Sequence, residues 1–184
     1  RESLSKPAYK EKLRLRSYSV PDMDSKVFLE IKKKYRGLVN KRRTTLELGE
    51  AYDFIETGVK PELQDYMNGQ VLNELEYCLN LYDLEPKVYI AYDRLAYFEK
   101  GNDDLRISFD TNIRTRRSDL LLESGDHGKR LLDSDVWLME IKTSLAKPLW
   151  LCEMLSEFEI RSSSFSKYGT EYKNMMARQK EMPK

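Results

Sequence analysis

Four segments of this chain place a charged or polar side chain at every second residue, and the residues between are apolar except Lys33. They are Lys12–Arg16, Glu30–Lys34, Arg106–Asp110 and Glu140–Lys142. Because successive side chains of a β-strand point to opposite faces, each segment predicts a strand with one apolar face and one charged, mostly basic face. If such strands close into a barrel, Lys and Arg line its interior, and confined cations require an anion to neutralise them. The pattern therefore predicts a pocket for a polyanion.

The first segment carries the strongest signal. Lys12, Arg14 and Arg16 are spaced about 6.5–7 Å apart along one strand face, at about 3.3 Å per residue. That spacing suits a chain of phosphoryl groups, each of which an Arg can bind through two hydrogen bonds. The alternative is a solvated edge strand whose charges prevent aggregation. An inward-facing lining is favoured because a sheet with a nearly all-cationic exposed face would repel itself. The other cations opposite an apolar face are Lys32, Lys34, Lys41, Arg43, Arg106 and Lys142.

Acidic residues share a face with several of these cations. Glu140 lies two residues before Lys142, Glu30 lies two before Lys32, and Asp110 lies four after Arg106. These acids either balance charge through salt bridges or hold a hard cation such as Mg²⁺ or Mn²⁺, which binds through one or two carboxylates on phosphate sites. We expect Glu140 to be the metal ligand. His127 is the single histidine, which argues against a zinc site.

The spacing of apolar residues, Gly and Pro predicts an α+β fold with mostly antiparallel pairing. We expect strands at 8–18, 26–35, 38–45, 88–99, 105–112, 118–123 and 136–143. We expect helices at 48–57, 61–84 and 148–159, with a C-terminal helix after a polar segment at 161–169. A length of 184 residues suits a single domain, residues 1–184.

Composition narrows the functional class. With 32 Lys and Arg against 31 Asp and Glu, the net charge of +1 does not favour a nucleic-acid-binding protein. Two distant cysteines without a CxxC motif fit the reducing cytoplasm. No apolar run approaches the roughly 20 residues that cross a bilayer. Because the chain begins at Arg1 within a basic stretch, we expect an N-terminal part of the native protein to precede it.

At these residues the chain resembles the polyphosphate polymerase domain of the vacuolar transporter chaperone (VTC) family, in its bacterial form. That family belongs to the CYTH, or triphosphate tunnel metalloenzyme, superfamily. The resembling stretches span nearly the whole chain and occur in the family's order: YKEKLRLRSY (9–18), VFLEIKKKYRGLVNKRR (27–43), YDRLAY (92–97), RISFDT (106–111), LMEIK (138–142) and FSKYG (165–169).

The resemblance implies an eight-stranded antiparallel β-barrel, a tunnel flanked by helices, whose first strand would lie before Arg1. It implies transfer of the γ-phosphoryl group of ATP onto a polyphosphate chain, with Mn²⁺ or Mg²⁺ bound at Glu140. We expect Arg14, Arg16, Lys32, Lys41 and Glu140 to carry catalysis. The residues that the resemblance matches to phosphate ligands are Arg14, Arg16, Lys32, Lys41, Arg43, Arg106, Lys167 and either Arg116 or Arg117, to which the alternation adds Lys12 and Lys142.

Two other functions use the same site. With water as the acceptor, the protein would be a triphosphatase. Without turnover, it would be a non-enzymatic module that binds polyphosphate or another phosphorylated ligand. The sequence leaves the oligomeric state undecided, and it leaves open a membrane partner of the kind that eukaryotic relatives meet through separate domains.

Overall fold

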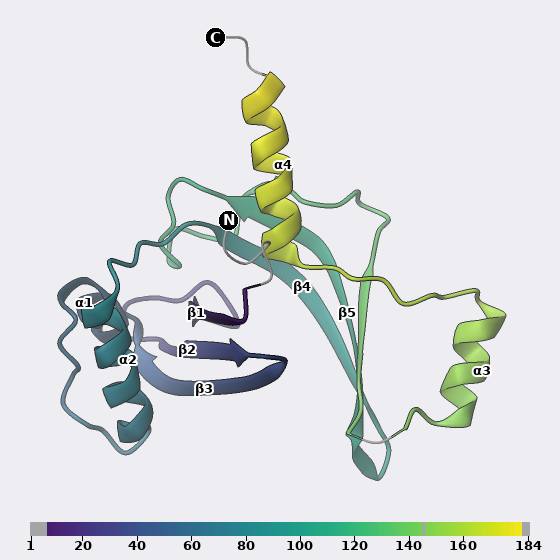
Figure 1. Ribbon diagram of the computed structural model, residues 1–184, viewed down its shortest axis with the longest axis horizontal. Helices are drawn as coiled ribbons and strands as arrows, with labels where there is room; N and C mark the ends of the chain where they lie inside the picture. The colour runs from purple at the N-terminus through teal and green to yellow at the C-terminus, as the bar shows by residue number, and fades with distance from the viewer. Residues whose placement is uncertain (1–6, 145, 182–184) are drawn as a thin grey trace. The chain divides into compact units, whose positions relative to one another are not determined.

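A computed structural model describes residues 7–144 and 146–181. The described chain groups into two compact units (Figure 1). The first comprises the described residues up to Tyr89 together with Arg117–Asp126, and the second comprises Ile90–Arg116 and the described residues from His127 onward. Both units combine antiparallel strands with helices, which confirms the α+β class.

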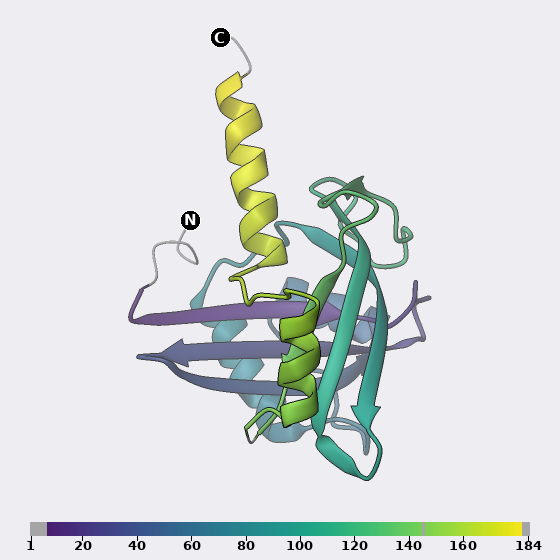
Figure 2. The ribbon, with the colours of Figure 1, turned by 90° about the vertical axis from the view of Figure 1, so that its right-hand side faces the viewer.

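The first unit holds a three-stranded antiparallel sheet in the order β1-β2-β3. Its strands are β1 (Tyr9–Arg16), β2 (Lys26–Tyr35) and β3 (Leu38–Glu47), which lie side by side in Figure 2. A two-residue turn joins β2 to β3 and places both Arg36 (φ 44°) and Gly37 (φ 93°) in the left-handed region. Such a turn matches the right-handed twist of a hairpin, so it fixes the β2–β3 register.

One face of this sheet forms the core with two helices, α1 (Leu48–Thr57) and α2 (Gly69–Leu81). The apolar residues that alternate with charges along β2 are buried against the helices, while Leu13 and Leu15 of β1 pack at the margin. The predicted division into an apolar and a charged face is therefore confirmed for these strands. The buried residues of the cluster are Val27, Leu29, Ile31, Leu46, Leu48, Ala51, Phe54, Val71, Leu72, Leu75 and Cys78.

Local signals explain where the helices begin and end. The Glu50 carboxylate accepts a hydrogen bond from the Glu47 backbone N–H at 3.0 Å at the start of α1, and Gly58 (φ 71°) ends it. Helix α2 begins after Asn68, whose Oδ1 accepts from the Val71 N–H at 3.1 Å. The predicted helix at 61–84 was therefore too long at both ends.

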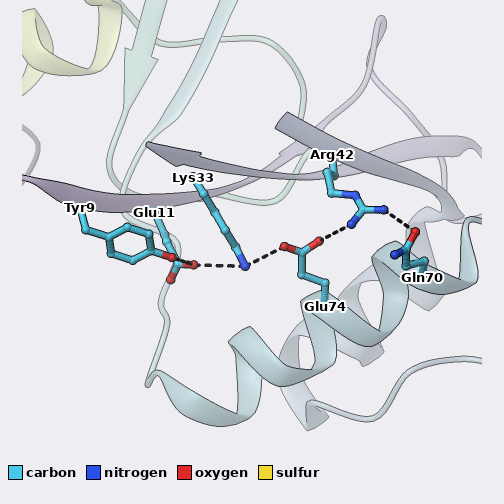
Figure 3. A network of polar contacts seen from close by, with 6 residues as sticks. All are labelled: Tyr9, Glu11, Lys33, Arg42, Gln70 and Glu74. Carbon is cyan, nitrogen blue, oxygen red and sulfur yellow. Dashed lines mark hydrogen bonds and ion pairs between the residues drawn. The ribbon is translucent and has the colours of Figure 1, made fainter. Parts of the chain in front are cut away.

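Polar contacts fasten α2 to the helix-facing side of the sheet (Figure 3). Lys33 Nζ lies 2.7 Å from Glu74 of α2 and 3.5 Å from Glu11 of β1. Arg42 of β3 donates to Gln70 at 2.6 Å and to Glu74 at 3.4 Å. The residues of this network alternate with those of the charged face, so its ion pairs stabilise the unit without using the predicted site residues.

The second unit holds a four-stranded sheet in which β5 (Asn102–Arg116) is bonded to β4 (Tyr89–Glu99), β6 (Lys129–Arg130) and β7 (Leu138–Lys142). Strands β6 and β7 pair antiparallel with β5. Helices α3 (Leu149–Glu157) and α4 (Lys167–Glu181) follow. Helix α4 begins at Lys167 and so includes the end of the segment that was expected to be polar loop.

The strand predicted at 118–123 is wrong, because that segment of the first unit is irregular, with bends and a turn. Its Leu122 N–H donates to the Tyr52 hydroxyl at 2.8 Å, and that hydroxyl donates to Glu123 at 2.6 Å. Asp119 has a φ of 53°, which does not fit an extended strand.

Over the residues that the structure describes, neither sheet closes on itself. None of the helices in the described ranges is long and apolar enough to cross a membrane.

Candidate functional site

The charged face of the first sheet brings six predicted site residues together. The strand register places Lys12 opposite Lys32, which in turn lies opposite Lys41. In the next row with the same orientation, Arg14 lies opposite Glu30, which lies opposite Arg43. Residues directly opposite in antiparallel strands point to the same face. Arg16 follows on the same face of β1, opposite Phe28. The alternation read from the sequence thus becomes a continuous cationic surface.

Glu30 organises the arginines of this face. Its side chain is 3% exposed, and it accepts hydrogen bonds from Arg14 Nε at 2.8 Å, from Arg14 Nη2 and from Arg16 Nη2 at 2.8 Å. Burial by itself would raise the pKa of Glu30, but the bonds from Arg14 and the charges of Arg14, Arg16 and Lys41 outweigh it and lower the pKa. Glu30 is therefore ionised at neutral pH and fixes two guanidinium groups by charge-assisted bonds.

Aromatic rings flank the same arginines. The guanidinium carbons of Arg43 and Arg16 lie 4.8 Å and 5.6 Å from the centre of the Phe28 ring. Tyr18 packs edge-to-face on Phe28 at 5.5 Å, and Arg16 lies 5.0 Å from the Tyr18 ring centre. A ring face attracts a guanidinium without using its N–H donors. Arg16 Nε is buried without a hydrogen-bond partner among the described residues.

In the row of Lys12, Lys32 and Lys41, none of the three strand positions holds an acidic residue. Burial lowers the pKa of Lys12, and the neighbouring charges of Lys10 and Lys32 lower it further. The second effect is repulsion between ammonium groups, from Lys10 on the same strand and from Lys32 on the adjacent strand. An anion bound here would relieve that repulsion.

The second unit has a different centre, Asp110, whose side chain is 2% exposed. Asp110 accepts from Arg94 Nε at 2.5 Å and Arg94 Nη2 at 2.7 Å, and from Lys167 Nζ at 2.5 Å. Burial would raise the pKa of Asp110, but the bonds and charges of Arg94 and Lys167 outweigh it and lower the pKa. The Lys167 ammonium also lies 4.4 Å from the centre of the Tyr92 ring. Lys167 of α4, 57 residues away in the sequence, therefore meets Arg94 of the paired strand β4 at this buried carboxylate.

Arg106, Ser108 and Asp110 share a face of β5, and the register places Arg106 opposite Lys142 and Ser108 opposite Glu140 on β7. Four predicted residues of this unit (Arg106, Lys142, Glu140 and Lys167) thus lie on or reach the same face of its sheet. Glu140 pairs with Lys142 at 3.3 Å and keeps 48% of its side chain exposed. Arg106 lies 5.3 Å from the Phe98 ring centre.

Glu140 was predicted to hold Mg²⁺ or Mn²⁺. The residues that the structure describes contain no group of three or more His, Cys, Asp or Glu placed to bind a metal. A cation that needs one or two protein carboxylates and takes its other ligands from phosphate and water still fits an accessible Glu140. A cation that requires a full set of protein ligands does not.

The two neighbouring arginines predicted as alternatives differ in their surroundings. Arg116, at the end of β5, is 8% exposed and donates to the His127 carbonyl at 2.8 Å. Arg117 is exposed and donates to the Lys87 carbonyl at 3.4 Å within the first unit. Arg116 thus orders the chain near His127, while the side chain of Arg117 is the more accessible of the two.

Sequence reasoning missed Arg94, Phe28 and Tyr18. Phe28 lies two residues before Glu30, so the same alternation would have placed it on the charged face. Arg94 is two residues after Tyr92 and is the single Lys or Arg of β4, so it gave no alternating pattern of cations. Its role became visible when β4 paired with β5 and brought it to Asp110.

A comparison with protein families decides where the chain belongs. The family model of the VTC domain matches residues 1–176. The chain is a member of the VTC domain family. This VTC domain includes every candidate residue of both units, and the family is linked to polyphosphate. No curated protein matches the chain.

Proposed function

We propose that this VTC domain is a metal-dependent polyphosphate polymerase that transfers the γ-phosphoryl group of ATP to the end of a polyphosphate chain. One observation carries the proposal: the charged face of the first sheet gathers Arg14, Arg16 and Arg43 around one buried carboxylate, Glu30, and continues into lysines. The family's link to polyphosphate identifies the anion for which such a face is suited. Both sheets would belong to the single tunnel domain that the resemblance implies.

The reaction needs positioning and charge neutralisation more than covalent chemistry by the protein. An oxygen of the terminal phosphate of the chain attacks the γ-phosphorus of ATP. The bond from that phosphorus to the β–γ bridging oxygen breaks, so ADP leaves and the chain gains one phosphoryl group. Because a terminal phosphate oxygen is already anionic at neutral pH, no general base is required.

Each predicted residue has a role in this reaction. Arg14 and Arg16 bind the transferred phosphoryl group, and Lys32 and Lys41 neutralise neighbouring phosphates. Glu140 holds Mn²⁺ or Mg²⁺, which would supply charge neutralisation at the phosphate oxygens. The remaining ligands are Lys12, Arg43, Arg106, Lys142, Lys167 and one of Arg116 and Arg117, and Arg94 joins them because it lies beside Lys167 at Asp110.

The decisive assay incubates the full-length protein with ATP and Mn²⁺, with and without a short polyphosphate primer, and separates the products on a gel stained for polyphosphate. A ladder of lengthening polymer supports the proposal. Release of phosphate without polymer would make the protein a triphosphatase, and tight binding without either product would make it a binding module.

Site variants connect the activity to the charged face. Arg14→Ala removes a donor to the transferred group, so we expect a loss of about 100-fold or more in rate. Glu140→Gln should cause a comparable loss that added Mn²⁺ reduces. Arg161→Ala, an exposed arginine outside both sheets, is the matched control. Wild-type activity in folded Arg14→Ala and Glu140→Gln proteins would refute these roles.

A further inference from the structure

The charged face of the first sheet divides into two halves of different chemistry. The arginine half consists of Arg14, Arg16 and Arg43 with the buried Glu30 between them. The lysine half consists of the next two same-facing rows, in which Lys12, Lys32 and Lys41 lie opposite one another and Lys10 lies opposite Lys34. Val39 of β3 lies opposite Lys34 and completes the second of these rows. No acidic residue occupies the lysine half.

Lysines placed directly opposite one another repel, which destabilises the sheet unless an anion is bound. Over the part of the chain that the structure describes, Lys10, Lys32 and Lys34 make no ion pair with an acid, whereas Lys33, on the other face of the same strand, pairs with two. Acids are thus plentiful on the helix-facing side and absent from the lysine rows. Lys32 and Lys34 are exposed and Lys10 is half-exposed, so all three are accessible to a ligand.

The two halves suit different tasks. The Arg14 and Arg16 guanidiniums are fixed by Glu30. A planar guanidinium held in one orientation presents its N–H donors in fixed directions, so it binds a phosphoryl group in one position. A Lys ammonium is a point charge on a flexible stem and does not select among equivalent phosphates of a chain. Lys10 lies four residues beyond Arg14 on β1, or about 13 Å along the strand. The lysine half therefore extends the site along the strands, away from the arginines.

We propose that Lys10 and Lys34, at the far end of the lysine half, bind the polyphosphate chain beyond the phosphoryl groups held at the arginines, so that this end of the charged face distinguishes a long chain from a short one. This inference rests on the proposed function, because it assigns the polymer to one end of the same charged face. The new element is a division of labour: the arginines bind the phosphoryl groups of any phosphate chain, whereas Lys10 and Lys34 bind only a chain long enough to reach them.

The test compares two anions on the full-length protein by titration calorimetry: inorganic tripolyphosphate and a polyphosphate several times longer. The variant is Lys10→Gln with Lys34→Gln, and the matched control is Lys100→Gln with Lys180→Gln, which removes two charges from exposed lysines of the second unit. Circular dichroism establishes that each variant is folded.

We expect the Kd for the long chain to rise by about 10- to 30-fold at 0.1 M salt, and its slope of log K against log salt to fall by about 1.4, at about 0.7 per lost cation. The Kd for tripolyphosphate should stay within about twofold, and the control should bind both anions like the wild type. Equal loss for both anions, or no loss for the long chain, would overturn the inference. If the wild-type protein binds neither anion, the proposed function itself fails. If the wild type binds both anions but the variant binds the long chain like the wild type, only this inference fails.

Discussion

Replacing Glu30 by Gln tests whether one buried carboxylate holds the cationic face together. The substitution keeps the shape of the side chain and removes its charge, leaving Arg14, Arg16 and Lys41 without their shared counter-charge. Breaking a fully buried ion pair costs about 3–5 kcal/mol. Because Arg16 is 21% and Arg14 53% exposed, solvent screens part of that cost. A hydrogen bond to a charged group contributes about 1.5–3 kcal/mol. We therefore expect a net loss of about 2 kcal/mol.

For a chain of this size, such a loss lowers the thermal midpoint by about 4–8 °C, measured by circular dichroism at pH 7. Polyphosphate should raise the midpoint of Glu30→Gln more than that of the wild type, because a bound anion replaces the missing charge. Glu56→Gln, at an exposed acid of α1, is the matched control and should leave the midpoint unchanged.

The same variant predicts a pH dependence. The pKa of Glu30 is lower in the folded protein than in the unfolded chain, so its contribution to stability is fully present above the unfolded value of about 4.3. That contribution is lost as the pH falls through the folded pKa. Urea unfolding of wild type and Glu30→Gln from pH 7 to pH 3 should therefore converge at the acidic end. A variant as stable as the wild type at pH 7, with a parallel pH profile, would refute the reasoning.

Three further predictions test other parts of the structure. Asp110→Asn removes the buried acid that pairs with Lys167. The free energy of unfolding in urea should therefore fall by about 3 kcal/mol, the low end for a broken buried ion pair, and an unchanged free energy would contradict this account. Phe28→Leu removes the ring beside two guanidiniums, so calorimetry should show tripolyphosphate binding weakened by about two- to fivefold; equal affinity would show that the ring has no part in the site. A double-mutant cycle of Lys33→Met and Glu74→Gln should give a coupling of about 0.5–1 kcal/mol, and additive effects would mean that this pair does not fasten α2.

The sequence determined the strands of the first unit and the side chains of their charged face. Alternation with a period of two assigns each residue of β2 to one face, and burying the apolar set leaves the register no freedom to slip by one residue. The left-handed turn at Arg36 and Gly37 then aligns β2 with β3. Predictions that depend on a local pattern and one buried face were therefore confirmed.

Predictions that depend on distant contacts failed or could not be made. Helix α2 begins at Gly69 because the Asn68 N–H donates to Thr44 Oγ1 of β3 at 2.9 Å while its side chain caps the helix. Residues 118–123 are not a strand, and the Leu122 N–H and the Glu123 carboxylate bond instead to the Tyr52 hydroxyl of α1. In both cases a contact from another element outweighed the local propensity.

The sequence by itself thus determined which side chains share a face of each strand, because that follows from covalent geometry and the side to be buried. The tertiary structure decided how charge is distributed among them. It buried Glu30 beneath two arginines and brought Lys167 of α4 to Arg94 and Asp110 on the paired strands β4 and β5. Ion pairs form between groups that folding brings within a few ångströms, and a linear pattern does not specify that separation.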